Sequence, residues 1–339
     1  YRKRASVVID RLIKLSETTG MRLMVRLVKG AYWDTEIKHA HVHGVEDFPV
    51  FTTKDGTDVN YLYCARKLLE ASPAIYPQFA THNAHTLASL RLIADELNVD
   101  AFEFQRLHGM GEPLYKAAGE ANRVRVYAPV GAHKDLLPYL VRRLLENGAN
   151  SSFVNTFLDD DVPVDDVVFD VVAKLEAGGS RHARIPRPGA LYGAERRNSV
   201  GRDLSVKSQR DAIAHAIKAL DDGPALQASP IISGKESGNG EKKNVVSPHD
   251  HSHVVGTVRW AETKDIDKAF EAAKKAQPGW DELGGVKRAD ILREMGQALE
   301  DNMERLIAIM AREGGKTLQD GIDEVREAVD FCRYYAHEA

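Results

Sequence analysis

The feature that most constrains this chain is a regular alternation of strand-like and helix-like segments over its first 150 residues. The residue pattern predicts short strands at 23–28, 78–81, 101–105 and 124–128. Helical periodicity separates these strands, and a further helix is predicted at 136–146, just after the last of them. Four strand–helix units in series favour a parallel sheet with right-handed crossovers.

Two α/β architectures accommodate such a series of units. Four units are half of an eight-stranded barrel, which takes about 250 residues when complete. A small doubly wound sheet is the competing architecture, and periodicity alone does not separate the two.

The rest of the chain has a different pattern. A break at 186–189 is followed by a predicted helix at 206–220 and by a linker or surface hairpin, rich in Gly, Ser, Lys and Pro, at 221–245. A strand is expected at 254–258. Three helices are expected after it, at 266–276, 287–312 and 320–335, with Pro278 and Gly279 ending the first.

Composition excludes several classes of protein. With 43% apolar and 28% charged residues the chain is not disordered as a whole. A net charge of −4 gives no indication of nucleic-acid binding, and no apolar run reaches the roughly 18 residues of a membrane helix. The two cysteines, Cys64 and Cys332, suit a reducing cytoplasm. Because the sequence starts and stops within helical patterns, we expect an excised piece of a longer polypeptide.

The strongest local signal is a polar helix face in the segment 136–146. Helical spacing places four side chains on this face: Tyr139, Arg142, Arg143 and Glu146. Two adjacent guanidinium groups repel each other unless an anion lies between them, and Arg is suited to holding a carboxylate with two hydrogen bonds. The alternative is a solvated charged face with an Arg143–Glu146 pair.

A second signal lies at the end of the first predicted strand. Arg26 lies within an apolar strand, where a charge needs a partner, and Lys29-Gly30-Ala31 follows at the carboxyl end of the strand. Ligand sites of α/β proteins occur at this edge, so the two cations suit a phosphate, a carboxylate or a polarised flavin ring. The alternative is a Lys29 side chain that only reaches out to water.

The other predicted strands also end in polar groups, namely His82 and Asn83, Gln105, and Tyr127. His82 and His85 lack a carboxylate or thiol nearby to complete a ligand set, so no metal site is expected here. The His-rich segment at 249–253 is interpreted as a polar turn. The Gly-Gly-Lys-Thr segment at 314–317 lacks the preceding strand of a phosphate-binding loop.

These residues resemble a known family. The resemblance rests on Arg26-Leu27-Val28-Lys29-Gly30-Ala31-Tyr32-Trp33-Asp34, on Thr81-His82-Asn83 and on the helix at 139–148, which are similar to the proline dehydrogenase domain of the proline utilization A family. Residues 191–199 resemble the segment that joins the two catalytic parts of that bacterial family, and 230–339 resemble the start of its aldehyde dehydrogenase part. The resemblance therefore implies a half-barrel at 1–150, a helical linker at 151–229 and part of an aldehyde dehydrogenase at 230–339.

The resemblance also implies an activity. The family oxidises proline with FAD in a distorted eight-stranded α/β barrel, and the hydrolysed product, glutamate semialdehyde, is oxidised to glutamate with NAD at a second site. Electrons pass from the reduced flavin to a membrane quinone, which implies a cytoplasmic protein peripherally bound to the membrane. A homo-oligomer is a further expectation.

Site residues follow from the same motifs. The proline carboxylate is expected between Arg142 and Arg143, and the substrate wall is expected to comprise Tyr32, Leu107, Tyr127 and Tyr139. Arg26 is expected beside the reacting nitrogen of the flavin, as the residue closest to catalysis. FAD is expected to be held by Arg26, Val28, Lys29, Gly30, Ala31, Trp33, Thr81, His82, Asn83, Gln105 and Glu146.

The resemblance implies that other parts of both sites lie outside this sequence. These include four barrel strands, the aldehyde dehydrogenase nucleophile and its NAD-binding strands, so Cys332 is not assigned as the nucleophile. We therefore expect the chain alone neither to bind FAD tightly nor to turn over either substrate. Two alternatives remain open: a split-gene subunit or inactive remnant, and an aldolase-type barrel in which Lys29 forms a Schiff base.

Overall fold

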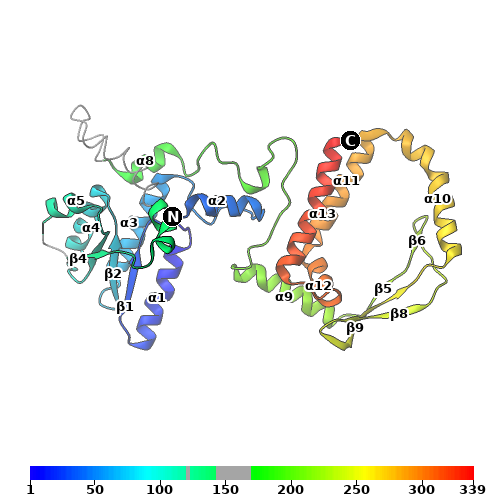
Figure 1. Cartoon of the computed structure of the whole chain (residues 1–339), viewed down its shortest axis with the longest axis horizontal. Coiled ribbons are helices and arrows are strands. Elements are labelled where there is room, and N and C mark those ends of the chain that lie inside the picture. Colours follow the sequence, from blue (N-terminus) through cyan, green and yellow to red (C-terminus); the bar gives the residue numbers. More distant parts are fainter. Residues whose placement is uncertain (120–122, 143–168) are drawn as a thin grey trace. The chain divides into compact units, whose positions relative to one another are not determined.

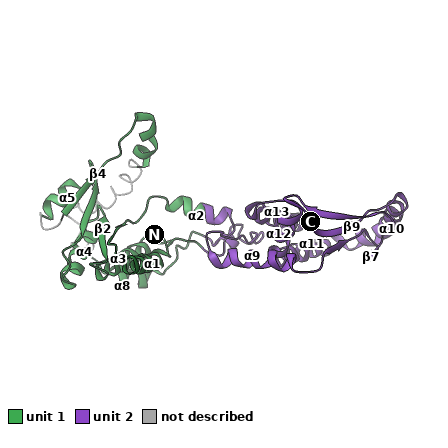
Figure 2. Cartoon of the chain, turned by 90° about the horizontal axis from the view of Figure 1, so that it is seen from below, with its two compact units in different colours: residues 1–38, 48–185 green, residues 39–47, 186–339 purple. Residues whose placement is uncertain are grey.

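The structure is a computed structural model, and it describes residues 1–119, 123–142 and 169–339. The chain forms two compact units (Figure 2). The first unit comprises 1–38 and 48–185, and the second comprises 39–47 and 186–339.

The first unit is built on a parallel sheet of four strands in chain order, as predicted (Figure 1). The strands are β1 (Leu23–Leu27), β2 (Ile75–Ala80), β3 (Glu103–Leu107) and β4 (Arg123–Tyr127). Strand β2 starts three residues before its predicted start at residue 78 and includes Pro77. Strand β3 pairs with β2 only from Gln78 onward, so Pro77 lies where β2 has a neighbour on one side, and the missing N–H is tolerated there.

Helices precede, connect and follow these strands. They are α1 (Ala5–Thr19), α2 (Trp33–Val42), α3 (Lys54–Glu70), α4 (Ala84–Glu96), α5 (Glu112–Ala117) and α8 (Val171–Gly178), and residues 133–142 are also helical. Helix α1 ends at Gly20, because this residue takes a left-handed conformation with φ of 68°.

The two faces of the sheet differ in chemistry. On one face, Phe79 and Phe104 pack in a hydrophobic core with residues of α3 and α4, such as Leu68 and Leu90. Alternation along each strand places the neighbouring residues on the opposite face. That face is polar, and it carries Arg26, Gln78, Glu103, Gln105 and Arg125.

The second unit combines a small sheet with five α-helices. The strands are β5 (Leu226–Ala228), β8 (Lys242–Ser247) and β9 (Asp250–Arg259) in the order β5–β9–β8, with a separate hairpin of β6 (Ile231–Ile232) and β7 (Lys235–Glu236). The helices are α9 (Lys207–Asp221), α10 (Thr263–Glu282), α11 (Gly284–Asp301), α12 (Met303–Glu313) and α13 (Leu318–Glu338). A hydrophobic core joins α9, α12 and α13.

Two helix predictions in this unit are wrong. Helix α10 does not stop at Pro278 but continues to Glu282, and the residues around Pro278 are exposed, so water can bond the carbonyl that Pro278 leaves without a donor. The single helix predicted at 287–312 is two helices that meet at Asn302. The break lets α12 bury Met303 in the core with α9, whereas Met295 of α11 remains 52% exposed.

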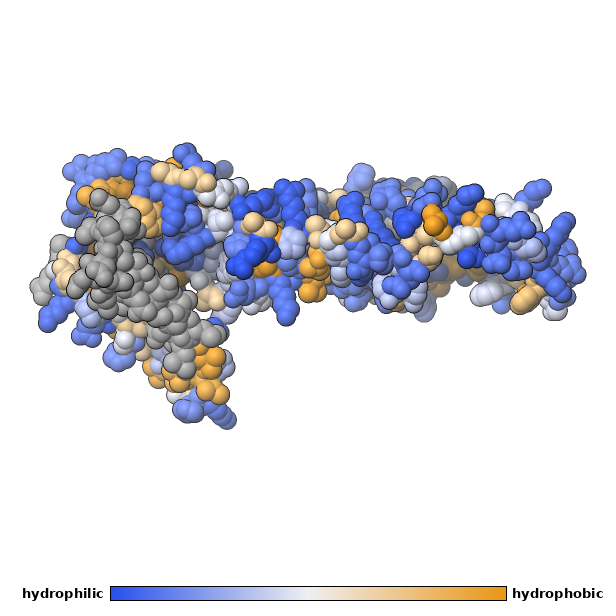
Figure 3. Space-filling model, turned by 90° about the horizontal axis from the view of Figure 1, so that it is seen from above, coloured by the Kyte–Doolittle hydropathy of each residue, from blue (hydrophilic) through white to orange (hydrophobic). Residues whose placement is uncertain are grey.

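Several large apolar side chains remain exposed in the two units. On the face shown in Figure 3, apolar residues form separate patches between hydrophilic ones. In the first unit the exposed residues include Met24 on β1 and Val126 on β4, the two outer strands of the sheet.

Candidate active site

The candidate site lies at the carboxyl edge of the four-stranded sheet. Its residues belong to β1, β3 and β4 and to the segments that follow β1, β2 and β4. In a parallel sheet the carboxyl ends of all strands lie at one edge, where α/β proteins place their ligand sites. The structure brings the predicted residues of the described part together in four groups.

The first group holds Arg26 in place. Arg26 Nε donates a hydrogen bond to Gln105 Oε1 at 2.8 Å, and its guanidinium carbon lies 4.8 Å from the centre of the Tyr127 ring. Among the described residues, Gln105 is the one that accepts a hydrogen bond from Arg26, so the terminal NH₂ groups are available for a ligand. Gln105 itself is only 6% exposed and therefore acts as a support for Arg26.

Glu103 supports this group, and the sequence analysis missed it. This carboxylate is 2% exposed and accepts hydrogen bonds from Gln78, Gln105 and Arg125. The hydrogen bonds from Arg125 hold the pKa of Glu103 at about 2, so the carboxylate is ionised at neutral pH. The polar alternation of 103 with 105 and of 123 with 125 was a signal that could have identified this face.

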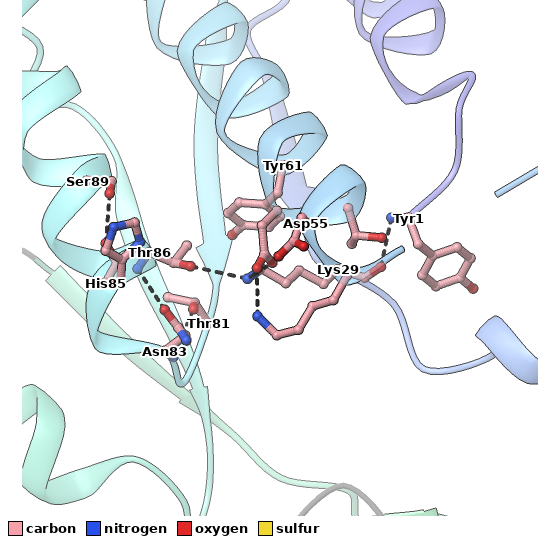
Figure 4. Close-up of polar contacts among 12 residues, drawn as sticks. Tyr1, Lys29, Asp55, Tyr61, Thr81, Asn83, His85, Thr86 and Ser89 are labelled. Atoms are coloured by element: carbon pink, nitrogen blue, oxygen red, sulfur yellow. Dashed lines mark hydrogen bonds and ion pairs between the residues drawn. The ribbon is translucent and has the colours of Figure 1, made fainter. Parts of the chain in front are cut away.

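The second group surrounds Lys29 (Figure 4). Lys29 Nζ lies 2.5 Å from Asp58 Oδ1 and donates to Thr86 Oγ1 at 3.2 Å, and Lys54 lies 2.7 Å from the other oxygen of Asp58. Burial lowers the pKa of Lys29 although Asp58 opposes the shift. Burial alone would raise the pKa of Asp58, but Lys29 and Lys54 lower it. Asp58 was not predicted, and only its spacing of four from Lys54 indicates a partner.

The residues next to Lys29 lie at the surface. Val28, Gly30 and Ala31 are exposed, and Gly30 has a φ of 106°, a conformation that favours glycine. The Tyr1 ring covers Gly30 so closely that a Cβ at this position would overlap it. Trp33 Nε1 donates to the Phe51 carbonyl at 2.7 Å, which fixes the indole.

The third group follows β2 and is held by backbone contacts. Thr81 Oγ1 accepts from the Asn83 N–H at 3.1 Å, and Asn83 Oδ1 accepts from the Thr86 N–H at 2.8 Å and thereby caps α4. His82 Nε2 accepts from the Leu107 N–H at 3.1 Å, so its ring proton is on Nδ1. Leu107 is buried.

The fourth group pairs Arg142 with Tyr32. The guanidinium carbon of Arg142 lies 5.2 Å from the centre of the Tyr32 ring, and Tyr139 is half-buried. Arg143 and Glu146 lie outside the described residues, so the paired arrangement of arginines stays a prediction.

Neither a metal cluster nor a membrane span is found in the described ranges. No three His, Cys, Asp or Glu side chains gather there in a way that could hold a metal ion. No described helix has the length and apolar character needed to cross a bilayer.

Two family models each match a part of the chain. Residues 1–156 match the proline dehydrogenase family, and residues 235–339 match the aldehyde dehydrogenase family. These matches confirm the order of the two parts, and both families imply redox cofactors.

Single proteins match the chain over nearly its full length. The bifunctional protein PutA of Escherichia coli is 46% identical over 99% of this chain and 26% of its own length. PutA of Rhizobium meliloti is 43% identical over 100% of this chain and 28% of its own length. A solved structure of Bradyrhizobium japonicum PutA, 42% identical, superposes with a TM-score of 0.80 over 100% of this chain and 31% of that one.

The chain thus spans about a quarter of the length of the curated relatives it matches. The α/β fold class is confirmed, and the four-stranded parallel sheet is consistent with half of a barrel.

Proposed function

Because this chain is homologous along its length to the bifunctional PutA proteins, we propose that the protein carrying it oxidises proline to pyrroline-5-carboxylate and then glutamate semialdehyde to glutamate. The observation that carries the proposal is the guanidinium of Arg26, held at the carboxyl edge of the sheet between Gln105 and Tyr127. A fixed cation with free N–H groups at this edge suits the acceptor atoms of a redox cofactor.

The first cofactor is proposed to be FAD, which accepts the hydride from proline when bound. The donor set fits it: Arg26 offers N–H groups, and Lys29 adds a cation whose charge Asp58 balances. Gly30 is proposed to contact the cofactor once the Tyr1 ring, which covers it here, moves away. Thr81, His82 and Asn83, which hydrogen bonds hold in place after β2, are proposed to contact the cofactor as well. The second cofactor is proposed to be NAD, bound by residues beyond this sequence.

The substrate is proposed to be held by its carboxylate between Arg142 and Arg143. The contact of Arg142 with Tyr32 supports this proposal. It places the guanidinium that would bind the carboxylate next to a ring that would line the substrate pocket. Tyr127, Tyr139 and Leu107 would complete the wall and exclude water. A membrane quinone as electron acceptor, peripheral attachment to the cytoplasmic membrane and a homo-oligomeric state complete the proposal.

The proposed division of the chain follows the same reasoning. Residues 1–150 would form the proline dehydrogenase part, 151–229 the linker and 230–339 the start of the aldehyde dehydrogenase part. The family matches at 1–156 and 235–339 support boundaries near these positions.

The test uses the natural protein that carries this sequence. We expect bound FAD in the purified protein, and loss of its visible absorbance when proline is added without oxygen. Replacing Arg142 by Met should raise the KM for proline about tenfold or more, because a charged hydrogen bond is lost. The control is Arg66→Met, which removes an exposed arginine that pairs with Glu96 on the helices. Absence of flavin, or no effect of proline on it, would refute the proposal.

One observation favours a second candidate, an aldolase-type Schiff base at Lys29. Burial lowers the pKa of Lys29, as a nucleophilic amine requires. The 2.5 Å ion pair with Asp58 opposes this, since it keeps the amine protonated. Treatment with borohydride and a carbonyl substrate distinguishes the two, because a mass adduct on Lys29 would support the second candidate and exclude the first.

A further inference from the structure

A row of polar side chains crosses the sheet on the face that carries Arg26. In the strand register, Gln78 lies opposite Arg26 on one side and Glu103 on the other, and Arg125 lies opposite Gln105. These residues therefore lie side by side on four neighbouring strands. Glu103 is in the centre of the row and is 2% exposed.

Glu103 is the acceptor that connects the row. Its Oε1 accepts from Gln78 Nε2 at 2.7 Å, from Gln105 Nε2 at 2.9 Å and from Arg125 Nε at 2.7 Å. Its Oε2 accepts from Arg125 Nη2 at 2.8 Å. A buried carboxylate with this many donors is well compensated for the loss of water.

This contact determines which way the Gln105 amide faces. An amide has an oxygen that accepts and a nitrogen that donates, and it can turn by half a rotation with little change in shape. An ionised carboxylate only accepts, so it holds the nitrogen of Gln105 on its own side. The oxygen of Gln105 then faces Arg26, where it accepts from Nε at 2.8 Å.

We propose that Glu103 is a positioning residue for the flavin site: it fixes the amide of Gln105, and Gln105 in turn aims the guanidinium of Arg26 at the cofactor. This inference rests on the proposed function, because it assumes that Arg26 contacts FAD. Glu103 touches neither substrate nor cofactor in this assignment, and it acts only through Gln105.

A simpler role for Glu103 makes a different prediction. Its two contacts with Arg125 join β3 to the outer strand β4, so Glu103 could serve stability alone. In that case, Glu103→Gln would lower the unfolding free energy of the first unit, but the FAD affinity and the hydrogen bond between Arg26 and Gln105 would stay unchanged.

The experiment measures FAD affinity and the visible flavin spectrum in the natural protein that carries this sequence. Glu103→Gln should weaken FAD binding about tenfold and shift the spectrum, since the Gln105 amide is free to turn and present a donor to Arg26. The double variant Glu103→Gln with Gln105→Glu keeps the net charge and returns an acceptor to Arg26, so it should recover most of the affinity. The matched control is Glu96→Gln, which also removes a carboxylate with two contacts to one arginine, but on the helices.

Two results would overturn the inference: unchanged FAD affinity in Glu103→Gln, or a double variant no better than the single one. A crystal structure of Glu103→Gln tests the contact without relying on flavin. We expect the 2.8 Å hydrogen bond between Arg26 and Gln105 to be lost, and its retention would contradict the inference. If the wild-type protein binds no FAD, the proposed function fails, while this crystallographic result still decides whether Glu103 orients Arg26.

Discussion

Single residues at the sheet edge are held by partners distant in the sequence. Asp58 of α3 neutralises Lys29 after β1, and its side chain is 9% exposed. Replacing Asp58 by Asn leaves Lys29 half-buried without its counter-ion, so we expect the first unit to lose about 2 kcal/mol of unfolding free energy. Urea denaturation measures this loss, with Asp10→Asn as the control, because the Asp10 carboxylate is exposed and pairs with Lys67. Equal losses in both variants would contradict this view of Asp58.

Glu103 should make stability depend on pH in a defined window. Hydrogen bonds from Arg125 depress its pKa from 4.5 to about 2, so its contribution is complete above pH 5 and is lost as the pH falls toward 2. We expect Glu103→Gln to be about 2 kcal/mol less stable at pH 7, with a difference that narrows below pH 4.5. Denaturation at several pH values measures this difference in unfolding free energy. The control variant is Glu17→Gln, because Glu17 is exposed on α1. If the difference in unfolding free energy between the wild type and Glu103→Gln became larger as the pH falls, the prediction would be wrong.

The sequence predicts which residue types lie at this edge of the sheet, but it does not predict which side chains contact one another there. Gln105 and Tyr127 are identified because each ends a predicted strand, and Arg26 is identified because it is a charge within an apolar strand; the structure brings the three together. Glu103 and Asp58 escape prediction because their partners depend on strand register and on helix packing. Those are set by contacts between segments far apart in the chain, such as the 29 residues from Lys29 to Asp58.

At the scale of elements, helices and strands are predicted where local signals agree with packing. The stop of α1 at Gly20 needs only a residue that tolerates positive φ. The break at Asn302 has no such marker, because the apolar spacing continues through it and only the burial of Met303 against α9 requires a new direction. Tertiary packing overrides local propensity there.

The second unit includes a close backbone crossing that can be tested. Gly201 donates its N–H to the Gly44 carbonyl at 2.8 Å, and a Cβ on Gly201 would overlap the carbonyl oxygen of His43. We expect Gly201→Ala to cost about 2 kcal/mol, because the two backbones would have to separate. Gly189→Ala is the matched control, as nothing lies within 4 Å of its added Cβ. Thermal unfolding of both variants measures the difference. A Gly201→Ala variant as stable as Gly189→Ala would show that the two backbones can separate at this crossing without loss of stability.

At the scale of the whole molecule, the sheet of the first unit is open on both sides. Within the described residues, β1 and β4 each have one neighbouring strand, and the order β1–β2–β3–β4 does not close. Apolar side chains on these outer strands remain exposed, among them Met24 at 60% and Val126 at 45%. Unpaired parallel edges with exposed apolar groups favour association with further strands.

This openness bears on what the 339-residue chain does alone. A barrel site draws its ligand contacts from several strands around a closed ring, whereas the sheet in the described part of this unit has four strands and does not close. We therefore expect the chain, expressed as written, to retain no stoichiometric FAD after gel filtration and to show no proline-dependent dye reduction. The longer natural protein that carries the sequence serves as the positive control. Stoichiometric FAD on the chain alone would contradict this expectation. It would mean that Arg26, Lys29 and the residues that hold them suffice to bind the cofactor without further strands beside β1 and β4.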